Sequence, residues 1–350
     1  MATIIVTGAT GFIGSWLCPL LTRQGHQVQV LLRRPEQLQA LQAQCAARGG
    51  EASRLQALVG DLSRPGLGLA STPAADLVYH LGARFAWGLN RAEAQQVNVE
   101  GGLQVVRLAS AIGARLVMVG GFMLENRVHQ RQIGIDPDHP LDSPWARVYD
   151  RVGAYEASKL EAHYRAVALA NELGVTWAAV HPATLCGHSE TGELAAAQPL
   201  QALITNLAAG RLKAIPGSPA HWLPLVSVDF LAALLAALAQ HPFHTGTSLL
   251  ALDEQSPDLA GMVASLAEGA GCASPSRYVP LPLLKGLLCL PGAEAVLQTR
   301  RESLAFIRRE RYDTAATRQF AEAAGLIWPD IHQAIVRSGR YGSTAMHRTA

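Results

Sequence analysis

The chain has 350 residues, of which 49% are hydrophobic and 16% charged, so it can bury a substantial core and is not intrinsically disordered. Its net charge of +2 argues against nucleic acid as the main partner. The five cysteines are scattered and lack C-x-x-C spacing, which predicts reduced thiols and no zinc site. We expect a cytoplasmic location, because no signal-peptide pattern precedes the first predicted strand.

The N-terminal segment predicts a strand, a glycine-rich turn and a helix. The β-branched run 4–6 precedes TGATGFIG (7–14), and apolar residues at helical spacing follow over 16–21. Glycines at this spacing make a tight turn, let backbone N–H groups approach a pyrophosphate and let the helix pack on the strand. The helix N-terminus then faces the anion. The candidate cofactor-binding residues are Gly8, Thr10, Gly11, Phe12, Ile13 and Gly14. The alternative is a plain strand–helix turn.

The second predicted strand, 26–32, ends at Arg33-Arg34. Dinucleotide folds that use NAD carry an acidic residue near this point. A carboxylate would repel a 2′-phosphate, whereas a guanidinium binds it with two hydrogen bonds. Arg33 and Arg34 therefore favour NADP(H), unless they only lie at the solvated start of the helix predicted over 36–48.

Two further strands, 55–59 and 76–81, also end in candidate cofactor residues. The first leads into Gly60-Asp61-Leu62, where Asp61 either accepts from the adenine amino group or caps the turn. The second leads into Leu81-Gly82-Ala83, whose small residues suit close approach of a ligand to the backbone. A helix over 91–112 and a fifth strand over 116–119 follow.

A long polar loop, 124–151, precedes the main catalytic pattern, and we expect it to be functional or mobile. The next helix reaches about residue 173 and opens with Tyr155-Glu156-Ala157-Ser158-Lys159. A Tyr and a Lys four apart share a helix face. The ammonium is expected to lower the tyrosine pKa, so that Tyr155 exchanges a proton near neutral pH. The alternative is an exposed amphipathic helix face.

Four features together carry a resemblance to a known family: TGATGFIG, Gly60-Asp61, Asn98 and YEASK. Over nearly its whole length, the chain resembles the extended (atypical) short-chain dehydrogenase/reductase family, which is NAD-dependent epimerase/dehydratase-like. The placement of Arg33 is similar to that in NADPH-dependent carbonyl reductases related to dihydroflavonol reductase. The resemblance implies an α/β fold: a doubly wound parallel (Rossmann) sheet with a smaller C-terminal α/β substrate domain. It also implies a possible homodimer through helices 91–112 and 152–173.

The resemblance further implies roles for individual residues. Tyr155 would be the acid/base, and Lys159 would hold the ribose and tune Tyr155. Asn98 and the backbone of Pro182, Ala183 and Thr184, after a strand at 175–181, would contact the cofactor. The expected domains are 1–185 plus 223–256 for NADP binding, 186–222 plus 257–337 for substrate, and a loose tail at 338–350.

One position departs from the family pattern. The family carries a Ser or Thr hydroxyl at the end of the fifth strand, and this chain has Gly121 there. Loss of one such donor costs about 100- to 1000-fold in rate. Three accounts are open: Ser143 or Tyr149 of the 124–151 loop replaces the hydroxyl, a water fills the space, or the protein turns over poorly.

The C-terminal part is less informative. The Leu-rich stretch 279–297 is interrupted by prolines and is a poor membrane span. It is either core of the small domain, or the wall of an apolar pocket or a membrane-touching surface. The arginines between 300 and 311 form either a solvated helix face or an anchor for a phosphate-bearing substrate. The histidines form no metal-ligand pattern.

These observations predict an NADPH-dependent oxidoreductase that transfers a hydride between nicotinamide and a carbonyl or secondary alcohol of a small, apolar substrate. Two alternatives remain. One is an epimerase or dehydratase of a nucleotide sugar from the same family. The other is a catalytically impaired NADPH-binding protein, because Gly121 replaces the usual hydroxyl.

Overall fold

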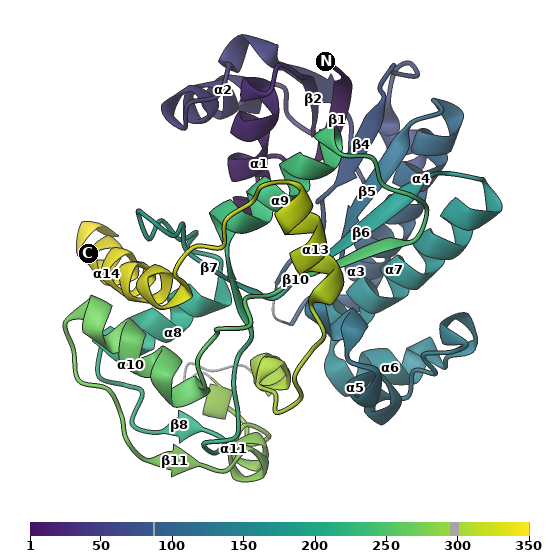
Figure 1. Cartoon of the computed structure of the whole chain (residues 1–350). Coiled ribbons are helices and arrows are strands. Elements are labelled where there is room, and N and C mark those ends of the chain that lie inside the picture. Colours follow the sequence, from purple (N-terminus) through teal and green to yellow (C-terminus); the bar gives the residue numbers. More distant parts are fainter. Residues whose placement is uncertain (87, 295–300, 350) are drawn as a thin grey trace. The chain divides into compact units, whose positions relative to one another are not determined.

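The computed structural model describes residues 1–86, 88–294 and 301–349. Its central feature is a seven-stranded sheet with the order β10-β6-β5-β4-β1-β2-β3 (Figure 1). The strands are β1 (Thr3–Thr7), β2 (Gln27–Leu32), β3 (Leu55–Val59), β4 (Leu77–His80), β5 (Arg115–Val119), β6 (Trp177–Pro182) and β10 (Thr247–Ala251). The pairings from β6 through to β3 are parallel. The strand order reverses beside β1, as in the doubly wound fold that the sequence predicts.

The chain divides into two compact units. Unit 1 contains Met1–His181, Ala232–Leu250 and Ala315–Gly325, and unit 2 contains Pro182–Leu231, Ala251–Thr314 and Leu326–Ala350. Two things differ from the expected boundaries. Residues 182–185, 223–231 and 251–256 group with unit 2, and 315–325, which includes α13 (Ala315–Ala323), groups with the large sheet.

Helices cover both faces of the sheet of unit 1. Figure 1 shows α4 (Gly101–Ala111) and α7 (Ala154–Glu172) on one face, and α1 (Phe12–Arg23) and α9 (Val228–Gln240) on the other. Alternate strand residues such as Ile5, Val78 and Leu116 pack with Val106 of α4 in one core cluster. Val106 and Leu160, which we considered for a dimer interface, are buried within this unit.

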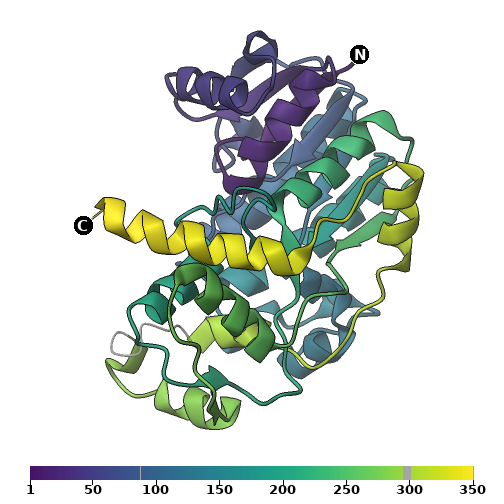
Figure 2. The ribbon, with the colours of Figure 1, turned by 60° about the vertical axis from the view of Figure 1, so that its left-hand side comes forward.

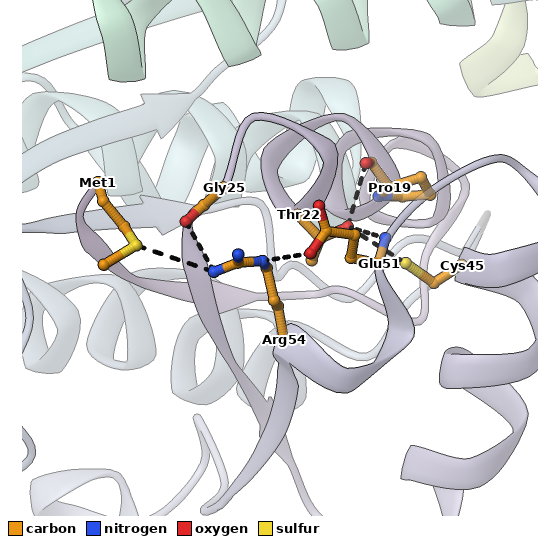
Figure 3. Close-up of polar contacts among 7 residues, drawn as sticks. All are labelled: Met1, Pro19, Thr22, Gly25, Cys45, Glu51 and Arg54. Carbon is orange, nitrogen blue, oxygen red and sulfur yellow. Dashed lines mark hydrogen bonds and ion pairs between the residues drawn. The ribbon is translucent and has the colours of Figure 1, made fainter.

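A polar cluster joins α1 and α2 (Gln37–Ala47) to the chain before β3 (Figure 3). The buried Thr22 hydroxyl donates to the carbonyl of Pro19, accepts from the backbone N–H of Glu51 and lies 3.4 Å from the Cys45 thiol. Arg54 donates to the carbonyl of Gly25 and pairs with Glu51. Cys45 is one of five free thiols.

The segment expected as a polar loop is largely helical, so that expectation is wrong. It forms η4 (Phe122–Glu125), α5 (Arg127–Ile133), η5 (Pro140–Asp142) and α6 (Trp145–Val152). The Asn126 side chain caps α5 by accepting from the backbone N–H of His129. Three of its polar side chains, those of His129, Gln130 and Tyr149, are buried and bonded to α7.

Unit 2 holds two small sheets and several helices. β7 (Thr184–Cys186) pairs with β9 (Leu225–Ser227), and β8 (Ile215–Pro216) pairs with β11 (Tyr278–Val279). The helical elements are α8 (Pro199–Ala208), α10 (Leu259–Ala270), α11 (Leu281–Leu287), η6 (Arg301–Phe306) and α14 (Ile331–Thr349). α14 lies across α10 (Figure 2). Gly269 permits this close crossing, because a Cβ there would lie 1.8 Å from the carbonyl oxygen of Val336.

α14 also corrects the expectation of a loose tail after residue 337. Ser338 is fully buried, donates to the carbonyl of Ala334 and accepts from the backbone N–H of Gly187. The small residues that suggested disorder instead allow close packing, since a Cβ on Gly339 would lie 2.3 Å from the carbonyl oxygen of Leu266.

The apolar stretch from residue 279 is not core over the part that is described. Leu283, Leu287 and Leu290 are 57%, 43% and 59% exposed, whereas Leu288 is buried. Residues 295–297 of this stretch lie outside the described residues. Among those described, no helix is long and apolar enough to span a bilayer.

Candidate active site

The glycine-rich turn joins β1 to α1 and has the geometry of a dinucleotide cradle. Gly8 has a φ of +74°, and a Cβ there would lie 2.7 Å from the backbone nitrogen of Gly82. A Cβ on Gly14 would lie 2.5 Å from the carbonyl oxygen of Gly8. Gly11 is the N-cap of α1 and offers no side-chain cap, so the first N–H groups of the helix are left for an anion. These features fit a nicotinamide dinucleotide, and Thr10, Phe12 and Ile13 lie on the same turn.

The ends of β2 and β3 carry the candidates for cofactor selection. Arg33 and Arg34 are exposed. The Asp61 carboxylate accepts from the backbone N–H and the hydroxyl of Ser63, as the capping alternative predicted. These bonds and the nearby Arg33 and Arg64 lower the pKa of Asp61, although burial opposes them. Arg64 is a cation at this edge that the sequence reading missed.

His80 ends β4 and holds the strand end to β1. Its Nδ1 lies 2.9 Å from the Thr7 hydroxyl, which accepts from the backbone N–H of Gly82. Burial and the charge of Lys159 lower the pKa of His80 to about 3. A Cβ on Gly82 would meet the Leu62 side chain at 2.7 Å, so the small residue expected here is required by packing. Leu81 and Ala83 flank it.

Asn98 lies in a π-helical turn, η3 (Gln95–Glu100), between α3 (Arg91–Ala94) and α4. Its side-chain oxygen accepts from the N–H of Arg84, and its amide nitrogen donates to the Arg84 carbonyl and to the Ser158 hydroxyl. Ser158 in turn donates to the carbonyl of Tyr155. Asn98 thus ties the segment after β4 to α7, and neighbouring Phe85 packs edge-on against Tyr155 with ring centroids 4.6 Å apart.

Tyr155 and Lys159 share one side of α7 as the sequence predicts, but their protonation differs from the expectation. Burial, aided by the Glu156 carboxylate, raises the pKa of Tyr155 above its usual range. Burial lowers the pKa of Lys159 to about 8, and Nζ donates to the carbonyl of Val119 at 2.9 Å. The expected lowering of the tyrosine pKa is therefore wrong for the cofactor-free protein, because burial and the Glu156 carboxylate both disfavour the phenolate.

The end of β5 contains two glycines with different surroundings. A Cβ on Gly120 would lie 2.4 Å from Nδ1 of His181, so the imidazole excludes any side chain there. A Cβ on Gly121 would meet only the side chain of Met123, with Sδ at 3.3 Å. The thioether of Met123 therefore borders the place where the family carries its hydroxyl.

The two hydroxyls proposed as a replacement differ in their contacts. The Tyr149 hydroxyl donates to the Glu161 carboxylate of α7 at 2.8 Å, and both residues are buried. The Ser143 hydroxyl accepts from the backbone N–H of Asp136, which leaves its own O–H able to donate. These contacts oppose Tyr149 as the replacement and leave Ser143 as the candidate.

Two more buried contacts anchor this segment to α7. His129 pairs with Glu156, which directly follows Tyr155, and both side chains are less than a tenth exposed. The Tyr164 hydroxyl donates to the side-chain oxygen of Gln130. The pairing of these residues depends on the folding of α5 and could not be predicted from the sequence pattern.

The three residues expected against the nicotinamide amide belong to unit 2. The N–H of Ala183 donates to the carbonyl of Ala251, and the N–H of Thr184 donates to the carbonyl of Pro224. These two donors are therefore engaged, and Pro182 has no N–H. Over residues 1–86, 88–294 and 301–349 no cluster of side chains could hold a metal ion.

The chain matches a family model for NAD-binding domains, described as male sterility protein, over residues 6–235. It is 27% identical to dihydroflavonol 4-reductase of Hordeum vulgare over 253 residues, 69% of this chain and 68% of the relative. It is 29% identical to 2-alkyl-3-oxoalkanoate reductase of Stenotrophomonas maltophilia (strain K279a) over 308 residues, 84% and 77% of the two chains.

The fold is shared with solved structures. The terminal R domain of the myxalamid PKS-NRPS pathway has a TM-score of 0.76 and 21% identity, covering 99% of this chain and 91% of that one. The structure of gox2253 has a TM-score of 0.70 and 20% identity, covering 99% and 98%. With the glycine cradle and the doubly wound sheet, the match to the family model shows that the chain belongs to the NAD-binding male sterility protein family, within the extended short-chain dehydrogenase/reductase group.

Proposed function

We propose that the protein is an NADP(H)-dependent oxidoreductase that interconverts a carbonyl and a secondary alcohol on a small apolar compound. The observation that carries this proposal is the placement of Tyr155 and Lys159 on α7, with Lys159 anchored to the end of β5. The family is NAD-binding, and two relatives are named as reductases. Their names support, by analogy, a carbonyl as the reacting group.

Tyr155 is the proposed proton donor. Its raised pKa keeps the phenol protonated at neutral pH, so it can deliver a proton to the oxygen of a bound carbonyl. A bound nicotinamide supplies the hydride in that direction. Lys159 is proposed to hold the ribose and to favour the phenolate once the proton has left.

The surroundings of Tyr155 and Gly121 within unit 1 include apolar side chains. Phe85 packs on the Tyr155 ring, and Met123 is buried beside Gly121. Such side chains favour an apolar substrate, whereas a nucleotide sugar requires polar partners. This supports a reductase over an epimerase or dehydratase.

We further propose that Arg33 and Arg34 select NADP(H). Both are exposed where β2 ends, and Arg64 lies near Asp61 at the neighbouring strand end. Cations at this edge suit a 2′-phosphate. Asp61 is already bonded to Ser63, which favours a role in the turn.

A second candidate is a cofactor-binding protein with impaired turnover. It is favoured by Gly121, since residue 121 carries no hydroxyl and the Tyr149 hydroxyl already donates to Glu161. The Tyr155–Lys159 arrangement favours an active enzyme, with a rate reduced by the missing donor.

The test is Tyr155→Phe, assayed by loss of NADPH absorbance with acetophenone, decanal and octanoyl-coenzyme A. Turnover should fall by at least about 100-fold, since proton transfer contributes about 100- to 10,000-fold. Tyr278→Phe, at a partly exposed tyrosine of β11, is the matched control and should keep its activity. Unchanged turnover in Tyr155→Phe would refute the role of the phenol.

A further inference from the structure

Three ionisable side chains near Lys159, those of His181, His163 and Glu125, have no role in the proposed mechanism. His181 ends the unit 1 part of β6 and is 2% exposed. His163 lies one helical turn after Lys159 on α7, and its ring packs edge-to-face against His181 with centroids 5.0 Å apart. Glu125 of η4 brings Oε1 to 3.8 Å from Nε2 of His181, and its side chain is 39% exposed.

The two ring nitrogens of His181 face opposite partners. Nε2 faces Glu125, which reaches solvent and also accepts from the Ser248 hydroxyl. Nδ1 faces Gly120, next to the Val119 carbonyl that holds Lys159. Nδ1 is buried and has no hydrogen-bond partner among the described residues. An unsatisfied buried nitrogen costs about 1–3 kcal/mol, so its position calls for an explanation.

We propose that His181 carries protons from Glu125, at the solvent end, to Lys159, and so restores the proton that Tyr155 gives to the substrate. This inference rests on the proposed function. A neutral imidazole suits the task, because it accepts a proton on one nitrogen and releases one from the other. The 3.8 Å between Glu125 Oε1 and His181 Nε2 is a separation that one water can bridge.

The proton balance closes without another reactant. Tyr155 gives one proton to the substrate oxygen, and the Lys159 ammonium returns one to the phenolate. The Lys159 amine then takes the proton of Nδ1 of His181, while Nε2 takes one that enters from solvent through Glu125. His181 is left protonated on Nε2 and returns to the Nδ1–H tautomer before the next turnover, so the net change is one proton removed from solvent for each hydride transferred.

The surroundings of His181 and His163 keep both imidazoles uncharged before the reaction begins. Burial, the neighbouring His163 and the Lys159 charge hold the pKa of His181 well below its usual range. Burial and Lys159 lower the pKa of His163 to about 4. Burial raises the pKa of Glu125, which lets it take up a proton. His80 of β4, also near Lys159, is neutral for the same reason.

The experiment follows NADPH oxidation and proton uptake together, by stopped flow with phenol red in weak buffer, using a compound from the panel above that the native enzyme reduces. In the native enzyme one proton should leave solution per NADPH without a lag. His181→Gln should oxidise one NADPH per site at the native rate before any proton uptake. Its later turnovers should be slower by about tenfold or more. Glu125→Gln should show the same order of events with a smaller loss.

His26→Gln is the matched control. His26 is also buried, at 5% exposure, and its Nε2 also lacks a partner among the described residues, but it lies at the opposite end of β2 from Arg33. It should behave as the native enzyme. Fluorescence titration of NADPH should give one affinity for all variants, and unfolding midpoints should show that each is folded.

The outcomes separate the two proposals. Absence of turnover by the native protein would refute the proposed function, and this inference with it. If the native enzyme turns over, two results would overturn the proton route alone. One is an equal loss of rate in the first and later turnovers of His181→Gln, and the other is no loss of rate in either His181→Gln or Glu125→Gln. ¹⁵N-histidine NMR of the cofactor-free protein should show a neutral His181 at pH 7, and a charged ring would also overturn it.

Discussion

Gly121 faces the side chain of Met123, and a Cβ at residue 121 would lie 3.3 Å from its sulfur atom and 3.6 Å from its methyl carbon. The far end of a methionine is flexible and adapts readily. The backbone of Gly121 is extended, with φ of −171° and ψ of 154°, so a larger residue needs no strained conformation. The position can therefore accept a side chain.

We expect Gly121→Ser to raise turnover by about tenfold or more, because it supplies the donor whose loss costs about 100- to 1000-fold in related chemistry. NADPH oxidation with the best substrate of the panel measures the change. Gly121→Ala controls for bulk without a hydroxyl and should not raise the rate. A serine variant no faster than the alanine variant would show that the hydroxyl is not what limits the enzyme.

Gly120→Ser should instead destabilise the protein. Its Cβ would meet His181 at 2.4 Å and Leu124 at 2.6 Å, and overpacking of this kind costs about 1–3 kcal/mol. Urea unfolding of the cofactor-free protein measures it, with Gly121→Ser as the paired control. Equal stability of the two variants would contradict the described position of the imidazole.

Glu156→Gln should lower the free energy of unfolding by about 1.5–3 kcal/mol, since it replaces the buried carboxylate that the His129 ring contacts with a neutral amide. Urea unfolding measures the loss. The exposed pair of Arg127 and Asp138 is the control, and Asp138→Asn should have a much smaller effect. Similar losses in both variants would argue against burial of the His129–Glu156 pair.

Stability should fall as the pH drops below about 6.5. The pKa of His80 is lowered to about 3 and that of His163 to about 4, chiefly by burial, from the ordinary value of 6.5. Below pH 6.5 these two histidines therefore bind protons in the unfolded chain but not in the folded chain. The free energy of unfolding consequently decreases toward pH 4 and below.

Urea unfolding between pH 7.5 and 4 tests this dependence. His163→Gln should make the free energy of unfolding less dependent on pH, because one histidine with a lowered pKa in the folded state is removed. His139→Gln, at an exposed position, should keep the native dependence. A native-like slope in His163→Gln would show that His163 takes up its proton equally in both states.

Thr22→Val should destabilise the protein by about 1–3 kcal/mol, because the Glu51 N–H loses its acceptor within a buried site. Thr247→Val removes a hydroxyl that donates to the His244 carbonyl at an exposed position and is the control. Urea unfolding measures both. If the two losses are equal, the polar cluster of Figure 3 does not contribute more than a surface bond.

The sequence was sufficient for most of the sheet of unit 1. Six of its seven strands are short apolar runs whose approximate bounds the sequence predicts, and two of them lead into Gly8 and Gly82, whose small size is required by close backbone contacts. Local pattern and tertiary packing agree there. The seventh strand, β10, was not predicted.

The sequence was insufficient wherever polar residues find buried partners far along the chain. His129, Gln130 and Tyr149 suggested a loop because their partners on α7 lie 12 to 34 residues away. The helix α14 depends likewise on glycines that allow a close crossing with α10. His181 was dismissed as lacking ligand partners, because only the fold places it beside Gly120 and Glu125.

The most direct test of the central claim is the rate of NADPH oxidation, with NADH as the comparison, over the ketone, aldehyde and acyl-thioester panel. The account predicts turnover of at least one compound with NADPH and much weaker turnover with NADH. Saturable NADPH binding with no turnover on any compound would contradict it and favour the impaired cofactor-binding protein. Equal rates with both cofactors would contradict the assignment of Arg33 and Arg34.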